Sequence, residues 1–399
     1  MMEKATHCRL CGDVLYSTVI KFQDQFVSNF VKKSSVTDGI EVPIDLVICD
    51  NCTLVQQVYS APQEILYSQN YWYRSGVTET MRQQLKDIVD ACFNEVNINK
   101  DYIILDIGAN DGTMLSHVRS KCITVGIDPA KNLFSQLQEN CDVASNDFWS
   151  AGVYQDLKKV HNLGKPKVVT AIGMFYDLED PMSFVKDIAD TMHEDGIFVA
   201  QLMTLEPMLE KNDLGNLCHE HLEFYTYSSL VYLFEHSGLE IYKVTENNTN
   251  GGSYRIFARK FKSGSISYKQ KIDYRSIEEF KKKVNLIGRE LNNLIDEINA
   301  KGELIHVLGA STKGNCILQY FGIDATKIKY ASERSPEKYG LYTIGTGIEI
   351  LSEDDSRAHN PDYYLILPWA FKDEIIARES DHVARGGKFI VPFPSLQVI

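Results

Sequence analysis

The sequence predicts an α/β protein made of three successive parts. In the first 66 residues, two C-x-x-C pairs indicate a small metal-binding domain. Between residues 67 and 265, buried strand segments alternate with helical segments, which favours a mainly parallel sheet covered by helices. After a long amphipathic helix, residues 266–399 repeat the strand, glycine turn and helix pattern on a smaller scale. We therefore expect three domains, with boundaries near residues 66 and 265.

The front domain, residues 1–66, is organised around two pairs of cysteines. Each C-x-x-C turn can aim two thiolates at one ion, and two such turns complete a tetrahedral zinc site. The four predicted ligands are Cys8, Cys11, Cys49 and Cys52. All four come from the protein, so we expect a structural site with no position open to substrate. Four unrelated thiols are disfavoured by the paired spacing, and a redox pair is disfavoured because neither pair opens a helix after a strand.

The central domain, residues 67–265, reads as a Rossmann-like sheet that ends in a hairpin. The strands are predicted in "YIILDIGANDG" (102–112), "ITVGIDPA" (123–130), "KVVTAIGMF" (167–175) and "GIFVAQLM" (196–203). A helix follows at 228–238, with a serine at its start and Gly238 as its stop. Then "LEIYKVTE" and "SYRIFARK" flank the turn-rich "NNTNGG" and predict an antiparallel hairpin. That outline is typical of class I methyltransferases, since a dinucleotide-binding sheet would continue with parallel strands.

The last part, residues 266–399, begins with a long helix. Ser276 and Glu279 have the spacing of a capping box at its start, and the helix ends near Gly302. Its apolar stripe recurs every three or four residues and predicts packing between domains: Ile277, Phe280, Val284, Ile287, Leu291, Leu294 and Ile298. Strands are then expected in "LIHVLGASTKGN", "KIKYASE", "YYLILPW" and "GGKFIVPF". We expect a second, smaller Rossmann-like α/β domain.

Composition excludes some classes of protein. The net charge of −13 argues against nucleic acid as the main partner, also for the zinc-binding domain, because phosphate binding needs a basic surface. The opening "MMEKATHCRL" has no apolar core of signal-peptide length, and no apolar run reaches the roughly 18 residues of a membrane span. Nine cysteines without an export signal favour a reducing compartment. We therefore expect a cytoplasmic protein with no membrane partner; its oligomeric state is left open.

The turn after the first central strand carries the cofactor signal. Gly108 and Gly112 would let the backbone pass close to a ligand, and the turn lacks the full G-x-G-x-x-G of dinucleotide enzymes, so NAD is disfavoured. Asp128 ends the next strand, where a carboxylate can accept both hydroxyls of a ribose; the alternative is a helix cap before Pro129. "SNDFW" offers an amide, an acid and an aromatic surface for adenine. The predicted ligand is S-adenosylmethionine, and the candidate residues are Asp106, Gly108, Asn110, Gly112, Asp128, Asn146, Asp147 and Phe148.

At this point the chain resembles a known family, the three-domain sugar-nucleotide C-methyltransferases. The resemblance covers nearly the whole chain: the paired C-x-x-C, "YWYRSG" (71–76), "ILDIGANDGTML", "HEHLEFY", "GGSYR" (251–255), "GASTKGN" (309–315) and "SPEKYG" (335–340). It implies that a base removes the acidic proton beside the ketone of a nucleoside-diphosphate 4-keto-deoxysugar, and that the enolate takes the methyl group of S-adenosylmethionine. It also implies catalytic roles for Tyr73 and for the pair Glu220 and His221. The third domain would help hold the nucleotide.

Two positions depart from the family. Cys218 stands where relatives acting at C-3 carry a tyrosine, and Tyr176 stands where they carry a histidine. These departures leave open which carbon is methylated, which sugar is used and whether the methyl group goes to carbon or oxygen. Sugar O-methylation is therefore the alternative reaction. A catalytically degenerate binding protein with a zinc ribbon and a methyltransferase fold is the alternative from another class.

The segment "NLCHEHLEFY" (216–225) carries the candidate base. In an extended segment, His219 and His221 would project to one face and Glu220 to the other. A metal site would need a third ligand, and nothing nearby has matching spacing. A structural turn is the stronger alternative. We favour catalysis because the segment lies between strand and helix in the cofactor domain, with His221 as base, Glu220 as its orienter or a substrate ligand, and His219 as the other candidate.

Other side chains are candidates for activating or holding the substrate. Tyr73 and Tyr176 could donate to the developing enolate oxygen. In "GASTKGN", a glycine turn at a helix start attracts anions and a lysine adds charge; the alternative is an ordinary turn with an exposed lysine. The candidate substrate ligands are Ser311, Thr312, Lys313, Asn315, Arg255 and Lys338. Arg255 and Lys338 could equally be solvated.

Overall fold

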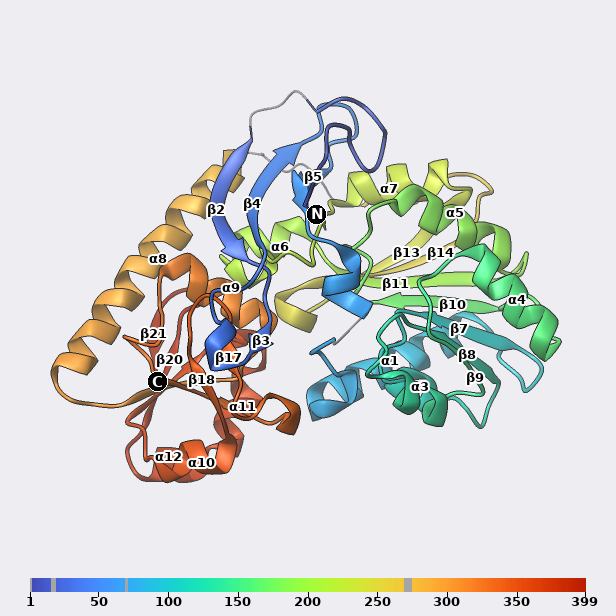
Figure 1. Cartoon of the computed structure of the whole chain (residues 1–399). Coiled ribbons are helices and arrows are strands. Elements are labelled where there is room, and N and C mark those ends of the chain that lie inside the picture. Colours follow the sequence, from blue (N-terminus) through green and yellow to red (C-terminus); the bar gives the residue numbers. More distant parts are fainter. Residues whose placement is uncertain (1, 16–18, 69–70, 269–274) are drawn as a thin grey trace.

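The computed structural model describes residues 2–15, 19–68, 71–268 and 275–399. Figure 1 shows three bodies of structure: a central α/β domain, a C-terminal α/β domain, and the front strands that lie above and between them. Among the described residues, no helix combines the length and the hydrophobicity needed to cross a membrane.

The front domain is built from short antiparallel strands that reach into both neighbours. Its strands are β1 (Glu3–Lys4), β2 (Ile20–Phe26), β3 (Phe30–Val31), β4 (Glu41–Ile48), β5 (Val55–Gln57) and β6 (Tyr59–Ser60). A four-stranded sheet has the order β12-β5-β4-β2, in which β12 (Glu223–Phe224) comes from the central domain. In turn, β3 pairs with β17 (Tyr342–Thr343) of the C-terminal sheet. Strand pairing thus crosses both predicted domain boundaries.

The central domain has a seven-stranded sheet of order β13-β14-β11-β10-β7-β8-β9. The strands are β7 (Ile103–Ile107), β8 (Ile123–Ile127), β9 (Val143–Ser145), β10 (Val168–Ile172), β11 (Ile197–Met203), β13 (Leu239–Asn247) and β14 (Ser253–Lys260). The first five are parallel, while β14 runs antiparallel to β11 and pairs with β13 as a hairpin. This confirms the predicted parallel sheet that closes in a hairpin. The three-residue β9 was not predicted, because so short a strand shows no periodicity.

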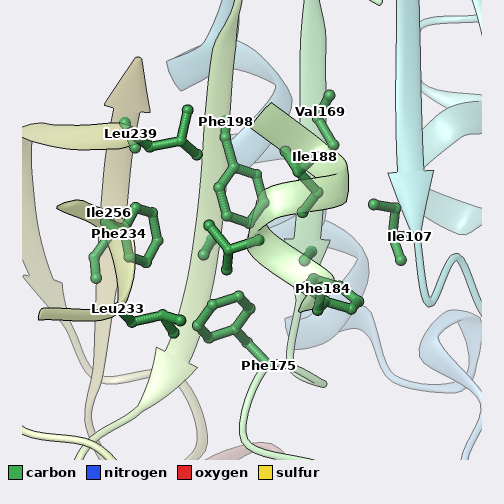
Figure 2. Packing of buried hydrophobic residues seen from close by; sticks show 14 of the residues in the cluster. Ile107, Val169, Phe175, Phe184, Ile188, Phe198, Leu233, Phe234, Leu239 and Ile256 are labelled. Carbon is green, nitrogen blue, oxygen red and sulfur yellow. The ribbon is translucent and has the colours of Figure 1, made fainter. Parts of the chain in front are cut away.

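Helices cover both faces of the central sheet. They are α1 (Glu79–Glu95), α2 (Thr113–Ser116), α3 (Phe134–Asn140), α4 (Ala151–His161), α5 (Pro181–Thr191), α6 (Leu205–Glu210) and α7 (Tyr227–His236). Along β11, Phe198 packs toward α5 and α7, and Val199 toward α1, because successive strand side chains point to opposite faces. Figure 2 shows the first of these packings, where Phe198 lies between Phe175, Ile188 and Phe234. Every residue of β11 is buried, as expected for a central strand.

The predicted helix at 228–238 exists, but its first turn differs. Thr226 is the N-cap residue, and its hydroxyl accepts a hydrogen bond from the Ser229 backbone N–H. The Ser229 hydroxyl accepts one from the Thr226 backbone N–H, which completes a capping box. Gly238 has φ +82° just beyond the helix, in agreement with the predicted stop.

The C-terminal domain begins with α8 (Arg275–Ala300) and contains an eight-stranded sheet. Seven of its strands are β15 (Ile305–Leu308), β16 (Tyr330–Glu333), β17, β18 (Glu349–Ser352), β19 (Tyr363–Ile366), β20 (Lys388–Val391) and β21 (Gln397–Val398), and the eighth is β3 of the front domain. Its other helices are α9 (Thr312–Phe321), α10 (Glu353–Ala358), α11 (Lys372–Arg378) and α12 (Ser380–Ala384). The four predicted strands, which correspond to β15, β16, β19 and β20, are confirmed. The flanking strands β17, β18 and β21 were not predicted.

Two details of α8 correct the prediction. Ser276 already lies inside the helix, so Ser276 and Glu279 do not form a capping box at its start. Ile295 rather than Leu294 continues the buried stripe, because a regular helix rotates the position of the stripe slightly with each turn. The stripe packs on α6 of the central domain and on β4 of the front domain, within one shared apolar cluster. The prediction that this helix lies between domains is therefore confirmed.

Candidate active site

The four predicted zinc ligands meet in one cluster. The sulfur atoms of Cys8, Cys11, Cys49 and Cys52 all lie within 4.8 Å of one another. Tetrahedral zinc with Zn–S bonds of about 2.3 Å places sulfurs about 3.8 Å apart, so the four thiols fit this ion. Gln56 Nε2 donates to the Cys8 sulfur at 3.1 Å, a second contact that orients the ligand. The site has the closed, all-protein ligand set of structural zinc.

Two cavities lie side by side between the domains. The first, here called the sheet-edge cavity, has a volume of about 410 Å³ and lies at the carboxyl ends of β7, β8 and β10. The second, here called the interdomain cavity, has a volume of about 350 Å³ and is lined by the central and C-terminal domains together with residues 71–78. The carboxyl edge of a parallel sheet is where ligands bind in open α/β folds.

Most of the predicted cofactor residues line the sheet-edge cavity. These are Gly108, Asn110, Asp128, Asp147 and Phe148. Gly108 has φ +69°, and a Cβ there would lie 2.7 Å from Met174 Cγ, so the turn tolerates no side chain. Phe148 is 44% exposed and offers its ring to the cavity. The residues present fit an S-adenosyl group, with a close backbone turn, a strand-end acid and an aromatic face.

Three other cofactor candidates support the cavity without lining it. Asp106 is buried behind the turn and accepts a hydrogen bond from the Thr170 hydroxyl at 2.6 Å. Burial raises the pKa of the Asp106 carboxyl to about 7, and Thr170 opposes the shift. Asn146 donates to the Asp128 backbone carbonyl at 2.9 Å. Gly112 has φ +76° and packs against α3, where a Cβ would lie 2.7 Å from Asn140. None of these three residues lines the cavity, so their direct contact with the cofactor stays a prediction.

Asp128 holds the glycine turn and faces the cavity at once. Its Oδ2 accepts the Asn110 N–H and its Oδ1 accepts the Ala130 N–H, both at 2.8 Å. Each carboxylate oxygen has a second lone pair, so the side chain can fix the turn and still accept ribose hydroxyls. The local hydrogen bonds expected of a helix cap are therefore compatible with a contact between Asp128 and the ribose.

Replacing Asp128 by alanine is expected to weaken S-adenosylmethionine binding at least about tenfold, because two hydrogen bonds to a charged acceptor are each worth about 1.5–3 kcal/mol. Isothermal titration of the variant gives the dissociation constant. Asp142→Ala is the matched control, since that carboxylate also accepts a backbone N–H, from Thr124 at 2.9 Å, but lines neither cavity. Equal affinity in Asp128→Ala and the native protein would leave Asp128 only the turn-holding role.

His221 points into the interdomain cavity with one nitrogen fixed. Its Nδ1 lies 3.0 Å from the Asn216 carbonyl oxygen, which can only accept, so Nδ1 carries the proton and Nε2 has a free lone pair. Burial lowers the pKa of His221 well below 6.5, the nearby Lys313 lowers it further, and the Asn216 carbonyl opposes both. His221 is thus neutral at neutral pH. The Asn216 carbonyl, rather than Glu220, orients the ring; Glu220 lines the cavity with a buried Oε2 that has no hydrogen-bond partner in the described part of the chain.

His219 does not take part in either cavity. The segment around residues 218–220 is a turn rather than an extended strand, so His219 and His221 do not share a face. His219 Nε2 lies 2.9 Å from the Val42 carbonyl of β4, and the side chain is 1% exposed. Burial lowers the pKa of His219 as well. The prediction of His219 as a candidate base is therefore wrong, and the residue joins the turn to the front domain.

The front domain also holds the backbone of this turn. Gln57 of β5 donates from Nε2 to the carbonyls of Cys218 and His221, at 2.6 and 2.7 Å. The Gln57 side chain is fully buried, so water cannot replace these bonds. Gln57, on a strand of the front domain, thus sets the position of the candidate base. The sequence did not predict this contact, because Gln57 and Cys218 are 161 positions apart in the chain.

The two tyrosine candidates differ. Tyr73 is 45% exposed and lines both cavities, so its hydroxyl can reach a bound ligand. Tyr176 is buried, its hydroxyl donates to the Gly173 carbonyl at 2.8 Å, and its ring packs on His221 with centroids 4.3 Å apart. Tyr176 therefore supports the base; it also lines the interdomain cavity, and its role as a donor to an enolate oxygen stays a prediction. Cys218 lines the interdomain cavity as a buried thiol, and burial raises its pKa well above 9.0.

The start of α9 forms the opposite wall of the interdomain cavity. Ser311 caps the helix by accepting the Gly314 N–H at 2.9 Å, and Ser311, Thr312 and Lys313 all line the cavity. Lys313 Nζ is 3.4 Å from Asn216 Oδ1, which places its charge beside the His221 segment. Lys338 also lines this wall, but its Nζ already donates to the Ala310 carbonyl and to Glu333, at 2.8 and 3.1 Å.

Two predicted substrate ligands lie outside both cavities. Asn315 is 1% exposed and bonds to the Ile344 carbonyl and the Thr346 hydroxyl, which it needs to hold the C-terminal domain together. Arg255 donates to Gln201 at 2.8 Å on the face of β14 that carries α1. Both predictions of direct substrate contact are wrong. Conversely, the cavities contain residues that the sequence did not single out: Tyr71, Asp177, Asp213, Arg334, Trp369 and Arg378.

Family models match the chain in three successive parts, and the last of them begins inside the predicted central domain. A zinc binding domain matches residues 8–67, a methyltransferase domain residues 77–244, and a C-methyltransferase C-terminal domain residues 248–394. The C-methyltransferase NovU of Streptomyces niveus is 26% identical over 410 aligned residues, which cover 98% of this chain and 96% of NovU.

Two solved methyltransferase structures are similar to somewhat less than half of the chain. Magnesium protoporphyrin IX methyltransferase ChlM from Synechocystis PCC 6803 is 10% identical with a TM-score of 0.33, over 45% of this chain and 79% of ChlM. An S-adenosylmethionine-dependent methyltransferase from Clostridium acetobutylicum ATCC 824 is 10% identical with a TM-score of 0.32, over 45% of this chain and 92% of that one.

The parallel sheet closed by a hairpin, its glycine turn, its strand-end acid and the matching models define an S-adenosylmethionine-dependent methyltransferase. Its front cysteines form the structural zinc site of the first domain. Zinc-binding, methyltransferase and C-methyltransferase C-terminal domain models match in that order along the chain, which is similar to the C-methyltransferase NovU over nearly the whole length of both proteins.

Proposed function

We propose that this enzyme methylates the carbon beside the ketone of a nucleoside-diphosphate 4-keto-deoxysugar, with His221 as the base. The observation that carries the proposal is the placement of His221, whose Nδ1 is held by the Asn216 carbonyl while the residue lines the interdomain cavity, next to the cofactor cavity. A proton next to a ketone is acidic enough for a neutral imidazole to remove when the enolate is stabilised.

The walls of the interdomain cavity suit a nucleotide-linked anion. The amino end of the ten-residue α9 presents backbone N–H groups and the Lys313 charge, which together favour a phosphate group. Arg334 and Arg378 also line the cavity, Arg378 paired with Glu353 at 2.6 Å and Arg334 at 3.9 Å from Glu374, and Trp369 offers an aromatic surface for a base. Trp369 is held in place because its Nε1 donates to Asp213 at 3.1 Å.

In this proposal each residue of the site has a separate role in the reaction. S-adenosylmethionine, when bound along the sheet-edge cavity, supplies an electrophilic methyl group. His221 Nε2 takes the proton from the carbon beside the ketone, and the electron pair of that C–H bond moves into the enolate. Tyr73 donates a hydrogen bond to the enolate oxygen, and the positive charge of Lys313 stabilises it.

Solvent exchange tests this proposal on the native enzyme. A nucleoside-diphosphate 4-keto-6-deoxyhexose incubated with enzyme in D₂O, without cofactor, is expected to gain deuterium at the carbon beside the ketone, as measured by mass spectrometry and proton NMR. Substrate incubated without enzyme corrects for spontaneous exchange. If the native enzyme methylates this substrate but catalyses no exchange, and the new methyl group is bound to oxygen, the enolate mechanism is wrong and O-methylation replaces it.

A further inference from the structure

The two cavities meet at a small set of shared residues. The residues that line both are Tyr71, Tyr73, Ser75, Ile172, Gly173 and Asp177. A methyl group must pass from a cofactor in the sheet-edge cavity to a substrate in the interdomain cavity. The donor sulfur therefore lies at this junction. In S-adenosylmethionine that sulfur is a sulfonium with a full positive charge, whereas in the product S-adenosylhomocysteine it is a neutral thioether.

Among these shared residues, Asp177 is the one carboxylic acid. It is 8% exposed, and its Oδ1 is buried with no hydrogen-bond partner among the described residues. The turn that carries it is fixed, because the Tyr176 carbonyl accepts the Leu222 and Glu223 N–H groups at 2.8 and 3.1 Å. Asp177 is thus a buried, rigidly placed acid whose oxygen lacks a partner. Such a group is costly unless a ligand supplies the missing interaction.

The surroundings of Asp177 favour a cationic ligand. Burial raises the pKa of Asp177 well above 3.8, the carboxylates of Glu220 and Glu223 raise it further, and Lys313 alone opposes them. Tyr71 and Tyr73 line the same junction, and burial together with the Asp177 charge raises the pKa of Tyr71, which is a neutral phenol. Their rings add negative electrostatic potential to the junction. A positive charge placed there would stabilise the ionised carboxylate and be stabilised by it.

We propose that Asp177, with the rings of Tyr71 and Tyr73, is the counter-ion of the cofactor sulfonium and makes the enzyme prefer S-adenosylmethionine over S-adenosylhomocysteine. When the methyl group moves to the substrate carbon, the sulfur keeps the electron pair of the broken bond and loses its charge. The attraction to Asp177 ends at that moment, so the used cofactor is released more easily. This inference rests on the methyltransferase class of the enzyme and does not depend on which substrate it methylates.

The test compares the dissociation constants of the two cofactor forms. In Asp177→Asn, a neutral side chain of the same size, titration calorimetry is expected to show S-adenosylmethionine binding weakened about tenfold or more. S-adenosylhomocysteine should stay within about twofold of its native value, which also shows that the variant is folded. Asp177→Glu, which keeps the charge, should retain most of the preference. Asp128→Ala is the matched control, because a ribose contact weakens both forms equally.

Two results would overturn the proposal. If Asp177→Asn weakens the binding of both cofactor forms equally, the Asp177 carboxylate contacts the amino-acid part that the two forms share. If the binding of both forms is unchanged, Asp177 does not contact the cofactor. If the variant does not fold, the proposal is tested by comparing ligands on the native protein. Sinefungin, which carries an ammonium in place of the sulfonium, should bind the native protein more tightly than S-adenosylhomocysteine, and the opposite order would refute the counter-ion role. None of these outcomes alters the exchange test of His221.

Discussion

His221→Asn should lower both α-proton exchange and methyl transfer by about 10² or more, while the affinity for S-adenosylmethionine stays near that of the native enzyme. Asparagine keeps much of the size of the ring and can still donate to the Asn216 carbonyl, but it cannot accept a proton near neutral pH. Exchange is measured in D₂O, transfer from a labelled methyl group, and affinity by calorimetry. Because His221 does not line the sheet-edge cavity, the cofactor should be unaffected.

His219→Asn is the matched control for this experiment. It changes the same residue type two positions away, in a side chain that contacts the Val42 carbonyl and neither cavity. It should lower stability and leave exchange per folded molecule near native. Glu220→Gln should reduce turnover less than His221→Asn if Glu220 only contacts substrate. Loss of turnover in the His219 variant together with native turnover in the His221 variant would reverse the assignment of the base.

The pH profile gives a second readout for His221. A base must be deprotonated to act, and burial holds the pKa of this imidazole well below 6.5. The acid limb of kcat/KM is therefore expected below pH 6.5, with full activity at neutral pH. In His221→Asn the residual rate should lose that limb. A native limb above pH 6.5 would mean that another group is the titrating base.

Cys49→Ser should cost the protein its zinc and the order of its front domain. Removing one of four thiolates breaks the tetrahedral set, and the binding energy of structural zinc, on the order of 10–16 kcal/mol in small peptides, is folding energy. Metal analysis should show zinc lost, limited proteolysis should cut the front domain, and S-adenosylmethionine binding should be largely kept. Cys122→Ser, at a buried thiol outside the cluster, is the control and should retain zinc.

The same variant should also lose α-proton exchange, because the front domain positions the base. Gln57 holds the carbonyls of Cys218 and His221, and β5 pairs with β12 just beyond that turn. Disorder in β5 would free the turn while leaving the sheet-edge cavity in place. Native protein without zinc would contradict the structural site outright. A zinc-free variant with native exchange would show that the turn keeps its position without the front domain.

The parts of the fold that could be predicted are those that local patterns determine. The strands of the central sheet are runs of apolar residues followed by glycine or acidic turns, so their existence and order follow from the chain itself. Four of the strands that were not predicted, β3, β9, β12 and β17, have two or three residues each. Such strands exist only because a distant partner supplies the hydrogen bonds, and no local pattern records a distant partner.

Some residues of the candidate site could likewise be predicted from local patterns, and others could not. The glycine turn and Asp128 were predictable because backbone conformation and strand ends set their positions. The position of Arg255 was not predictable. Successive side chains of β14 point to opposite faces of the sheet, so Tyr254 packs on the α7 face and Arg255 lies on the α1 face. His219 was misjudged because a turn replaces the assumed extended segment. Asp177 lies in the acidic run "DLEDP", where Asp180 caps α5, so nothing in the sequence distinguishes a cavity acid from a helix cap.

The exchange of strands between domains limits how such an enzyme can be recombined. A front domain transplanted onto another methyltransferase would bring β5 with its β12 partner left behind, and β3 without β17. Each graft would expose backbone N–H and C=O groups on open sheet edges, which invite pairing between molecules. New specificities in chimaeras of this architecture are therefore better sought by changing side chains along the cavity walls than by shuffling whole modules at their sequence borders.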